Sequence, residues 1–178
     1  MKILRAVLTG CVVVLAAAGL IQAAVTANQT VTMTVNSICV LALTGNPSAL
    51  TVTAPATGGL DPSNPTDTST YAQYTSTVPT GQSRRLTAAW GGADAAPAGC
   101  SLKLTASSPG GNKGTSSGQV TVSATAQNIV TGIRSCATGS GGTYGAQLTY
   151  LLSVDTVDNL VSGESKTATI SLTLTDAA

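Results

Sequence analysis

Apolar and polar residues alternate with a period of two along most of this chain. Near its end, Ile170, Leu172 and Leu174 alternate with serine and threonine, which is typical of a strand with one buried face. A helical interpretation fails because the runs are short, rich in threonine and valine, and bounded by glycine and proline. The expected strands cover residues 31–35, 40–43, 50–52, 70–78, 83–90, 100–106, 118–126, 128–133, 145–154 and 167–175.

The spacing of these segments predicts an all-β fold. Eight or nine strands joined by loops rich in glycine, proline, serine and aspartate indicate an antiparallel β-sandwich, immunoglobulin-like or of the jelly-roll type. The longest loops are expected at residues 56–69, 107–117 and 134–143. We assign the sandwich domain to residues 37–178.

The N-terminal pattern is that of a secretory signal peptide. Lys2 and Arg5 precede an apolar run over residues 6–21, and small residues follow it. We expect residues 1–24 to be removed, with the cleavage site open to within a few residues, and the protein to be secreted to the cell surface or beyond. The chain has no second long apolar stretch, so we expect no membrane span in the mature protein.

The composition argues against partners that need charge. Charged residues make up 8% of the chain, aromatic residues 3%, and histidine is missing. Loss of Lys2 and Arg5 with the signal leaves six of the eight basic residues against seven acidic ones, a net side-chain charge of −1. Nucleic acid therefore has no basic surface to bind. A surface with so little charge resists self-association weakly, which favours a subunit of an assembly.

Catalytic motifs are weak, and we expect neither an enzyme nor a cofactor. Gly114 to Gly118 match the G-x-S-x-G pattern of a hydrolase elbow, but that motif needs a following helix and a histidine. Paired carboxylates fall mainly in loops, with few aromatic residues to hold a sugar. Two clusters of oxygen-bearing side chains have two interpretations: they bind calcium, or their side chains cap the backbone of their own turns. These clusters are Asp61, Asn64 and Asp67, and Asp155, Asp158, Asn159 and Glu164.

Three cysteines remain after Cys11 leaves with the signal, namely Cys39, Cys100 and Cys136. An exported protein favours a disulfide, and three cysteines permit three single pairings. We favour a bond between Cys100 and Cys136, because both are expected at strand ends beside glycine-rich turns. Cys39 would then be a buried free thiol or an intermolecular link. Pairing of Cys39 with one of the other two is the alternative.

The chain resembles known secreted proteins in two ways. The export signal, the strands rich in small residues and threonine, and the closing KTATISLTLTDAA resemble fimbrial and pilin-like immunoglobulin-fold subunits in a general way. A second likeness, over about 25 residues, is to uncharacterised small secreted bacterial β-sandwich proteins. It rests on residues 128–133, 136–139 and 148–150. The first resemblance implies self-assembly into filaments, and the second implies no activity.

We therefore expect a structural subunit of an extracellular filament of the pilus or fimbria type, a homopolymer assembled by strand complementation. Residues 25–36 form the candidate donor strand, because this segment lies at the freed terminus, alternates cleanly and contains no proline. In the alternative, both terminal strands pair within one monomer. The alternative function is a monomeric or dimeric secreted binding module for carbohydrate or surface adhesion. The expected subunit interface comprises Val31, Met33, Val35, Ile170, Leu172 and Leu174.

Overall fold

The structure is a computed structural model that describes residues 26–91 and 95–177. The signal peptide expected over residues 1–24 lies outside the described residues. The chain divides into two units, residues 1–34 and 35–178. In the first unit, residues 26–34 form neither a strand nor a helix. The second unit carries every strand found in the described residues.

The expected all-β fold class is confirmed. The described residues hold ten strands. The expected segments 31–35 and 50–52 form no strand, whereas the two-residue strands β5 and β8, which are too short to leave a periodic pattern, were not expected. The strands are β1 (Cys39–Thr44), β2 (Thr66–Ser76), β3 (Arg84–Trp90), β4 (Cys100–Ala106), β5 (Thr115–Ser116), β6 (Gln119–Thr121), β7 (Gln127–Ile133), β8 (Cys136–Ala137), β9 (Ala146–Val154) and β10 (Ile170–Asp176). Two short 3-10 helices are η1 (Gly111–Lys113) and η2 (Val157–Asn159).

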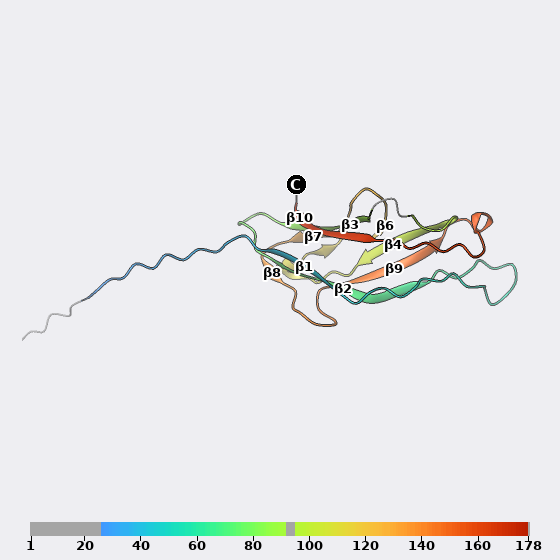
Figure 1. The fold of residues 1–178 in the computed structure, drawn as a ribbon. Coiled ribbons are helices and arrows are strands. Elements are labelled where there is room, and N and C mark those ends of the chain that lie inside the picture. The colour runs from blue at the N-terminus through green and yellow to red at the C-terminus, as the bar shows by residue number, and fades with distance from the viewer. Residues whose placement is uncertain (1–25, 92–94, 178) are drawn as a thin grey trace, which may run out of the picture. The chain divides into compact units, whose positions relative to one another are not determined.

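The strands form two antiparallel sheets that pack as a sandwich (Figure 1). The larger sheet has the order β1-β2-β9-β4-β6, with β8 also paired to β2, and the smaller sheet has the order β10-β3-β7-β5. The core lies between them. Leu86 of β3 and Ile129 of β7 are fully buried, as are Leu104 of β4 and Leu148 of β9. Alternation within each strand turns one face toward this core.

Part of the strand order matches the immunoglobulin arrangement, in which strands A, B, E and D form one sheet and C, F and G the other, although β5, β6, β7 and β8 have no counterpart in it. In order along the larger sheet, β1, β2, β9 and β4 take the places of A, B, E and D. In the smaller sheet, β3 and β10 take the places of C and F. The place of G, beside the outer edge of β10, holds no strand among the described residues.

A search of the described residues for a helix that is long and apolar enough to span a bilayer finds none. The only helical elements there are the three-residue helices η1 and η2.

Candidate subunit interface

Two edge strands, one from each sheet, lie on the same side of the sandwich. β1 ends the larger sheet and β10 ends the smaller sheet. We call the gap between them the seam. At one end of the seam the two edges come close together, because the Cys39 Sγ lies 3.6 Å from the carbonyl oxygen of Leu174. The seam widens toward the other end, where β10 begins.

The apolar side chains of β10 face the core but are incompletely covered. Ile170, Leu172 and Leu174 are partly buried and pack against the core cluster. On the neighbouring strand β3, the inward-facing Leu86 and Ala88 are completely buried. The difference arises because β3 lies between two strands, whereas β10 has one neighbour. The three side chains that were expected at an interface are therefore half covered by their own subunit.

The backbone of β10 also presents hydrogen-bonding groups that its pairing with β3 does not use, of which the Leu174 carbonyl oxygen accepts from the Cys39 thiol. Pairing with β3 uses the odd-numbered residues, since Ala177 N donates to Ser83 O over 2.9 Å and Thr173 O lies toward Thr87. Amide and carbonyl directions alternate along an antiparallel strand. Ile170, Leu172 and Leu174 therefore direct their amide and carbonyl groups away from β3, toward the seam. An edge of this kind is a template for another strand.

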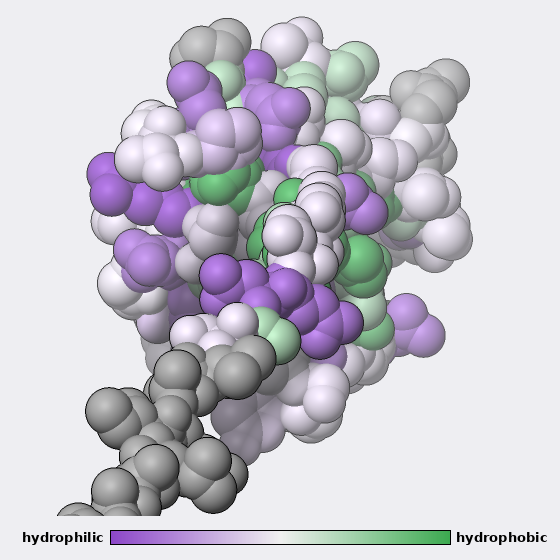
Figure 2. All heavy atoms as spheres, turned by 90° about the vertical axis from the view of Figure 1, so that its left-hand side faces the viewer, coloured by the Kyte–Doolittle hydropathy of each residue, from purple (hydrophilic) through white to green (hydrophobic). Residues whose placement is uncertain are grey.

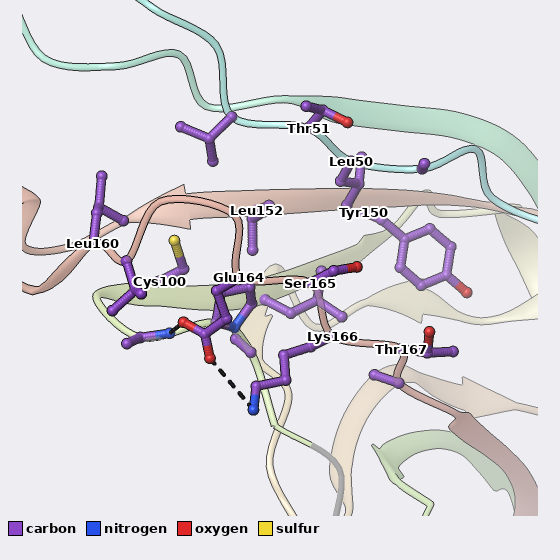
Figure 3. A pocket seen from close by; sticks show the side chains of 18 of the residues that line it. Leu50, Thr51, Cys100, Tyr150, Leu152, Leu160, Glu164, Ser165, Lys166 and Thr167 are labelled. Atoms are coloured by element: carbon purple, nitrogen blue, oxygen red, sulfur yellow. Dashed lines mark hydrogen bonds and ion pairs between the residues drawn. The ribbon is translucent and has the colours of Figure 1, made fainter.

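A cavity of about 1030 Å³ opens at the wide end of the seam (Figure 3). Segments 47–52 and 160–168 line its sides, and residues 96–98 together with side chains of β4, β9 and β10 line the rest. Its apolar lining residues include Leu50, Val52, Leu102, Leu152, Leu160 and Ile170. An apolar void of about 150 Å³ already fits a benzene-sized group, so this cavity has room for several side chains.

The charged groups of the cavity lie on segment 160–168, and polar side chains also come from β9 and from segment 47–52. Lys166 Nζ and Glu164 Oε1 form an ion pair of 3.3 Å. The amide of Ala98 donates to Glu164 Oε2 over 2.9 Å, and this hydrogen bond lowers the pKa of the Glu164 carboxyl. Burial raises the pKa of Tyr150 to about 12, with the Asp67 charge as a smaller cause. No general base or nucleophile arrangement results from these groups.

Asp67 fixes the segment that forms one wall of the cavity. Its Oδ2 accepts from the amide of Ser48 over 3.1 Å, and its Oδ1 accepts from the amide and hydroxyl of Ser69 over 2.9 and 2.7 Å. These hydrogen bonds from Ser69, followed by those from Ser48, lower the pKa of Asp67 to about 2. Within the described residues, no group of three or more acidic or cysteine side chains is placed to hold a metal ion. The carboxylate acts here as a turn cap.

The candidate donor side chains are exposed. Val31 is 66% exposed, Met33 87% and Val35 85%. Residues 26–38 form no strand, although their alternation predicts one. The physical reason is that a strand needs a neighbour for its backbone hydrogen bonds. Residue 25, the first of the expected donor segment, lies outside the described residues.

The expected disulfide between Cys100 and Cys136 is wrong for the folded chain, in which all three cysteines are free thiols. Cys100 pairs with Val154 at one end of β9, whereas Cys136 pairs with Ser76, beyond the other end of that nine-residue strand. Eight residue steps along β9, from Val154 to Ala146, and four more along β2, from Ala72 to Ser76, separate them, which is roughly 40 Å along the sheet at about 3.4 Å per residue. A disulfide requires Cα atoms within about 7 Å.

The register also excludes the other two pairings within one subunit. Cys39 and Cys136 both pair with Ser76, from opposite sides of β2. Two strand spacings, about 10 Å, separate them. Cys39 lies at the same end of the sheet as Cys136 and hence far from Cys100. Burial raises the pKa of both the Cys100 and the Cys136 thiols. The sequence held no signal for this register, which depends on strand pairing.

Sequence reasoning missed Arg84 as an organising residue. Its side chain is buried at the narrow end of the seam, where its Nε donates to Asp176 Oδ1 over 2.8 Å. Its Nη2 donates to Ser37 Oγ over 2.9 Å, and its Nη1 donates to the carbonyl oxygen of Ile38. The end of the sandwich on the left of Figure 1, viewed face-on in Figure 2, shows apolar side chains in patches between polar ones. Alternation along a strand implies only that neighbouring residues such as Arg84 and Arg85 point to opposite faces.

A scan against protein-family models and searches of curated proteins and of solved structures find no match to this chain. The interpretation of the seam therefore rests on its geometry.

Proposed function

We propose that the protein is a structural subunit of an extracellular filament, in which residues 25–36 of one copy fill the seam of the next copy. The observation that carries this proposal is the unfinished edge at β10. That strand combines half-buried apolar side chains, backbone groups directed toward the seam, and an adjoining apolar cavity. A strand supplied by a second copy would complete all three features.

The donor and the edge have matching periods. Val31, Met33 and Val35 are spaced by two residues, as are Ile170, Leu172 and Leu174. Residues that lie opposite each other on paired strands turn their side chains to the same face of the sheet. A donor placed in this register therefore adds three apolar side chains to the core, while Thr32 and Thr34 face outward.

The binding free energy of the donor segment in the seam of the next copy depends on every side chain that points inward. Burying each one contributes about 1.5–3 kcal/mol, and each edge hydrogen bond adds about 0.5–1.5 kcal/mol net. Ordering the donor backbone costs about 1–2 kcal/mol per residue. Because gain and cost are of the same size, loss of one inward side chain is enough to weaken the joint. Filling the cavity then decides whether a stable filament forms.

Export completes the proposal. The signal peptide expected over residues 1–24 delivers the chain out of the cytoplasm, and its removal frees residue 25 and those after it as a new terminus. The nearly uncharged surface, with 8% charged residues in the whole chain, opposes lateral association of filaments only weakly. The partner is a second copy of this chain.

The test compares residues 25–178 with residues 37–178, both exported to the periplasm. We expect the longer chain to form filaments in negative-stain electron microscopy and the shorter chain to stay monomeric. A synthetic peptide of residues 25–36 should bind the shorter chain, raise its melting temperature and block filament growth when added to the longer chain. A peptide with Met33→Asp is the matched control.

A monodisperse monomer from residues 25–178, with amides 31–35 already protected from hydrogen exchange, would overturn the proposal. That outcome means that the segment pairs within its own subunit, and it would favour the secreted binding module. A shorter chain that still forms filaments would overturn it equally, because the donor is then dispensable.

A further inference from the structure

The cavity beside β10 lies within one subunit, and its walls are mainly aliphatic (Figure 3). Leu102 and Leu152 line it from the larger sheet, and Val52 and Leu160 line it from the segments at its sides. Among the described residues, Tyr150 is the one aromatic side chain on its walls. An alkyl chain packs well against such walls, whereas a sugar ring there would leave most of its hydroxyl groups without hydrogen-bond partners. The walls therefore favour an aliphatic ligand.

Tyr150 presents an unsatisfied hydroxyl group to this cavity. Its side chain is 4% exposed, and within the part of the chain that the structure describes its Oη has no hydrogen-bond partner. The equally buried Tyr74, by contrast, donates to the carbonyl oxygen of Lys113 over 2.6 Å. The Tyr150 hydroxyl is not sealed off from solvent as the unpartnered Thr70 Oγ1 is, so the cavity reaches it. Burial raises the pKa of Tyr150 to about 12, which keeps the hydroxyl protonated and able to donate to a ligand oxygen.

Lys166 supplies an ammonium group with spare donors at the mouth of the cavity. Its side chain is 49% exposed, and its Nζ contacts Glu164 Oε1 at 3.3 Å. An ammonium group has three donors, and this ion pair uses one. Both oxygens of Glu164 are already engaged, because Oε2 accepts from the amide of Ala98 over 2.9 Å. The unused hydrogen-bonding capacity of this charged pair is therefore donor capacity, which suits an anionic group.

We propose that the cavity binds a free hydroxy fatty acid, with its carboxylate at Lys166, its alkyl chain against the aliphatic walls and its chain hydroxyl beside Tyr150. One ammonium group matches the single charge of a carboxylate. The volume of about 1030 Å³ lies at the upper end of the range for small-molecule sites, about 300–1,000 Å³. The site belongs to one copy of the chain and so goes beyond the proposed function. A ligand and a donor strand that both reach Ile170 would exclude each other there.

Calorimetry tests the proposal on residues 25–178 carrying Met33→Asp, a substitution that keeps donor strands out of the cavity under the proposed function. Light scattering verifies that the titrated chain is monomeric. The ligands are decanoate and hydroxydecanoates with the hydroxyl at different carbons, each below its critical micelle concentration. We expect one decanoate to bind per chain and at least one hydroxydecanoate to bind about 3- to 10-fold more tightly, the gain of one hydrogen bond. No binding, or equal binding of all the acids, overturns the inference and leaves the proposed function standing.

Two substitutions assign the two polar groups of the ligand. Tyr150→Phe should abolish the preference for the hydroxylated acid and leave decanoate binding unchanged, whereas the matched control Tyr74→Phe should keep the preference. Lys166→Gln should weaken decanoate binding roughly 5- to 10-fold, the loss of a hydrogen bond to a charged group, and leave the binding of the uncharged decan-1-ol unchanged. A preference that survives Tyr150→Phe, or equal weakening of the acid and the alcohol by Lys166→Gln, contradicts the assignment. Thermal unfolding verifies that each variant is folded.

Trp90, the single tryptophan of the chain, reports where the ligand binds. It pairs with Ile170, which lines the cavity, and residues paired in this way turn their side chains to the same face of the sheet. A bromine atom on the alkyl chain quenches tryptophan fluorescence on contact, so bromodecanoate should quench Trp90 far more than decanoate does. A smaller pocket lies elsewhere, lined by residues 78–82, 112, 134 and 135. Binding of bromodecanoate without quenching would place the ligand outside the cavity and overturn the inference.

Discussion

Arg84 and Asp176 form an ion pair in which the partners differ sharply in burial. The Arg84 side chain is 6% exposed and that of Asp176 is 80% exposed, and Nε and Oδ1 are 2.8 Å apart. The pair joins the first residue of β3 to the last residue of β10. Arg84 also donates hydrogen bonds to Ser37, Ile38 and Ser76. A single buried cation therefore connects the segment before β1 with the end of β10 at one end of the seam.

Replacing Arg84 should destabilise the subunit more than replacing its partner. For Arg84→Gln we expect the free energy of unfolding to fall by about 1–3 kcal/mol. The reason is that the buried Ser76 hydroxyl and the carbonyl oxygen of Ile38 lose the hydrogen bonds that the guanidinium group donates. Asp176→Asn should have a much smaller effect, since water solvates the exposed position. Urea unfolding of the chain lacking residues 1–36 measures both. Equal losses in the two variants would contradict the assigned burial.

Alternate residues of the donor should respond oppositely to the same substitution. Met33→Asp places a charge in the seam, and we expect the peptide of residues 25–36 to bind at least about 100-fold more weakly. Thr34→Asp makes the same change on the outward face and should alter binding only several-fold. Fluorescence anisotropy of labelled peptides with the chain lacking the donor measures both. Similar losses at positions 33 and 34 would show that the donor does not bind as a strand.

The acid stability of the subunit should depend on Asp67. Its pKa is lowered to about 2 from the ordinary 3.8, so its contribution to stability is complete above about pH 4 and is lost as the pH falls toward 2. We expect Asp67→Asn to be less stable than the parent at pH 7 and to show a shallower loss between pH 4 and pH 2. Urea unfolding at these pH values gives both slopes. Parallel slopes would mean that the Ser48 and Ser69 contacts do not persist in solution.

The thiol of Cys100 should report on occupation of the seam. Cys100 lines the cavity, and burial raises its pKa, with Asp155 and Glu164 adding to the shift. We expect iodoacetamide to modify Cys100 several-fold more slowly once the donor peptide is bound. Cys136 lies at the other end of the sheet and serves as the internal control. Peptide mapping by mass spectrometry follows both sites, and uniform protection of the two would point to global stabilisation instead.

The turn before β9 should depend on Gly145. Its φ is +99°, and a Cβ there would lie 2.1 Å from the carbonyl oxygen of Ala72. We expect Gly145→Ala to lower the free energy of unfolding by about 2 kcal/mol or more, from strain and from the clash. Gly142→Ala, in the same loop with open space around it, should change little. Thermal unfolding of the two variants checks the difference.

The strands could largely be predicted, because each leaves its own local pattern. The segments expected at 83–90, 100–106 and 128–133 correspond to β3, β4 and β7 within two residues. The two-residue strands β5 and β8 were missed because no period can be read from two residues. Residues 31–35 alternate as clearly as β10, yet only β10 is a strand. Alternation shows which face of a segment is apolar, but a strand forms only where a neighbouring strand can accept and donate its backbone hydrogen bonds.

For the expected interface residues, too, one property can be predicted from the sequence and another depends on the tertiary structure. The apolar character of Ile170, Leu172 and Leu174 is visible in the sequence, whereas their partial coverage follows from the position of β10 at the end of its sheet. The Cys100–Cys136 pairing failed for a related reason. Glycine-rich turns beside both cysteines gave local context but no register, and the pairing of β4, β9 and β2 sets the two thiols at opposite ends of the sheet.

The sequence alone determined that this chain forms strands, that one face of each strand is apolar, and that little charge covers the surface. These properties are local, since side-chain direction alternates along a strand and composition is a simple sum. Only the tertiary structure decided that β1 and β10 are edge strands, that a cavity lies beside the first residue of β10, and that Arg84 connects Ile38, just before β1, with the last residue of β10. Those relations arise from strand order and register, which connect residues as far apart in the sequence as Arg84 and Asp176.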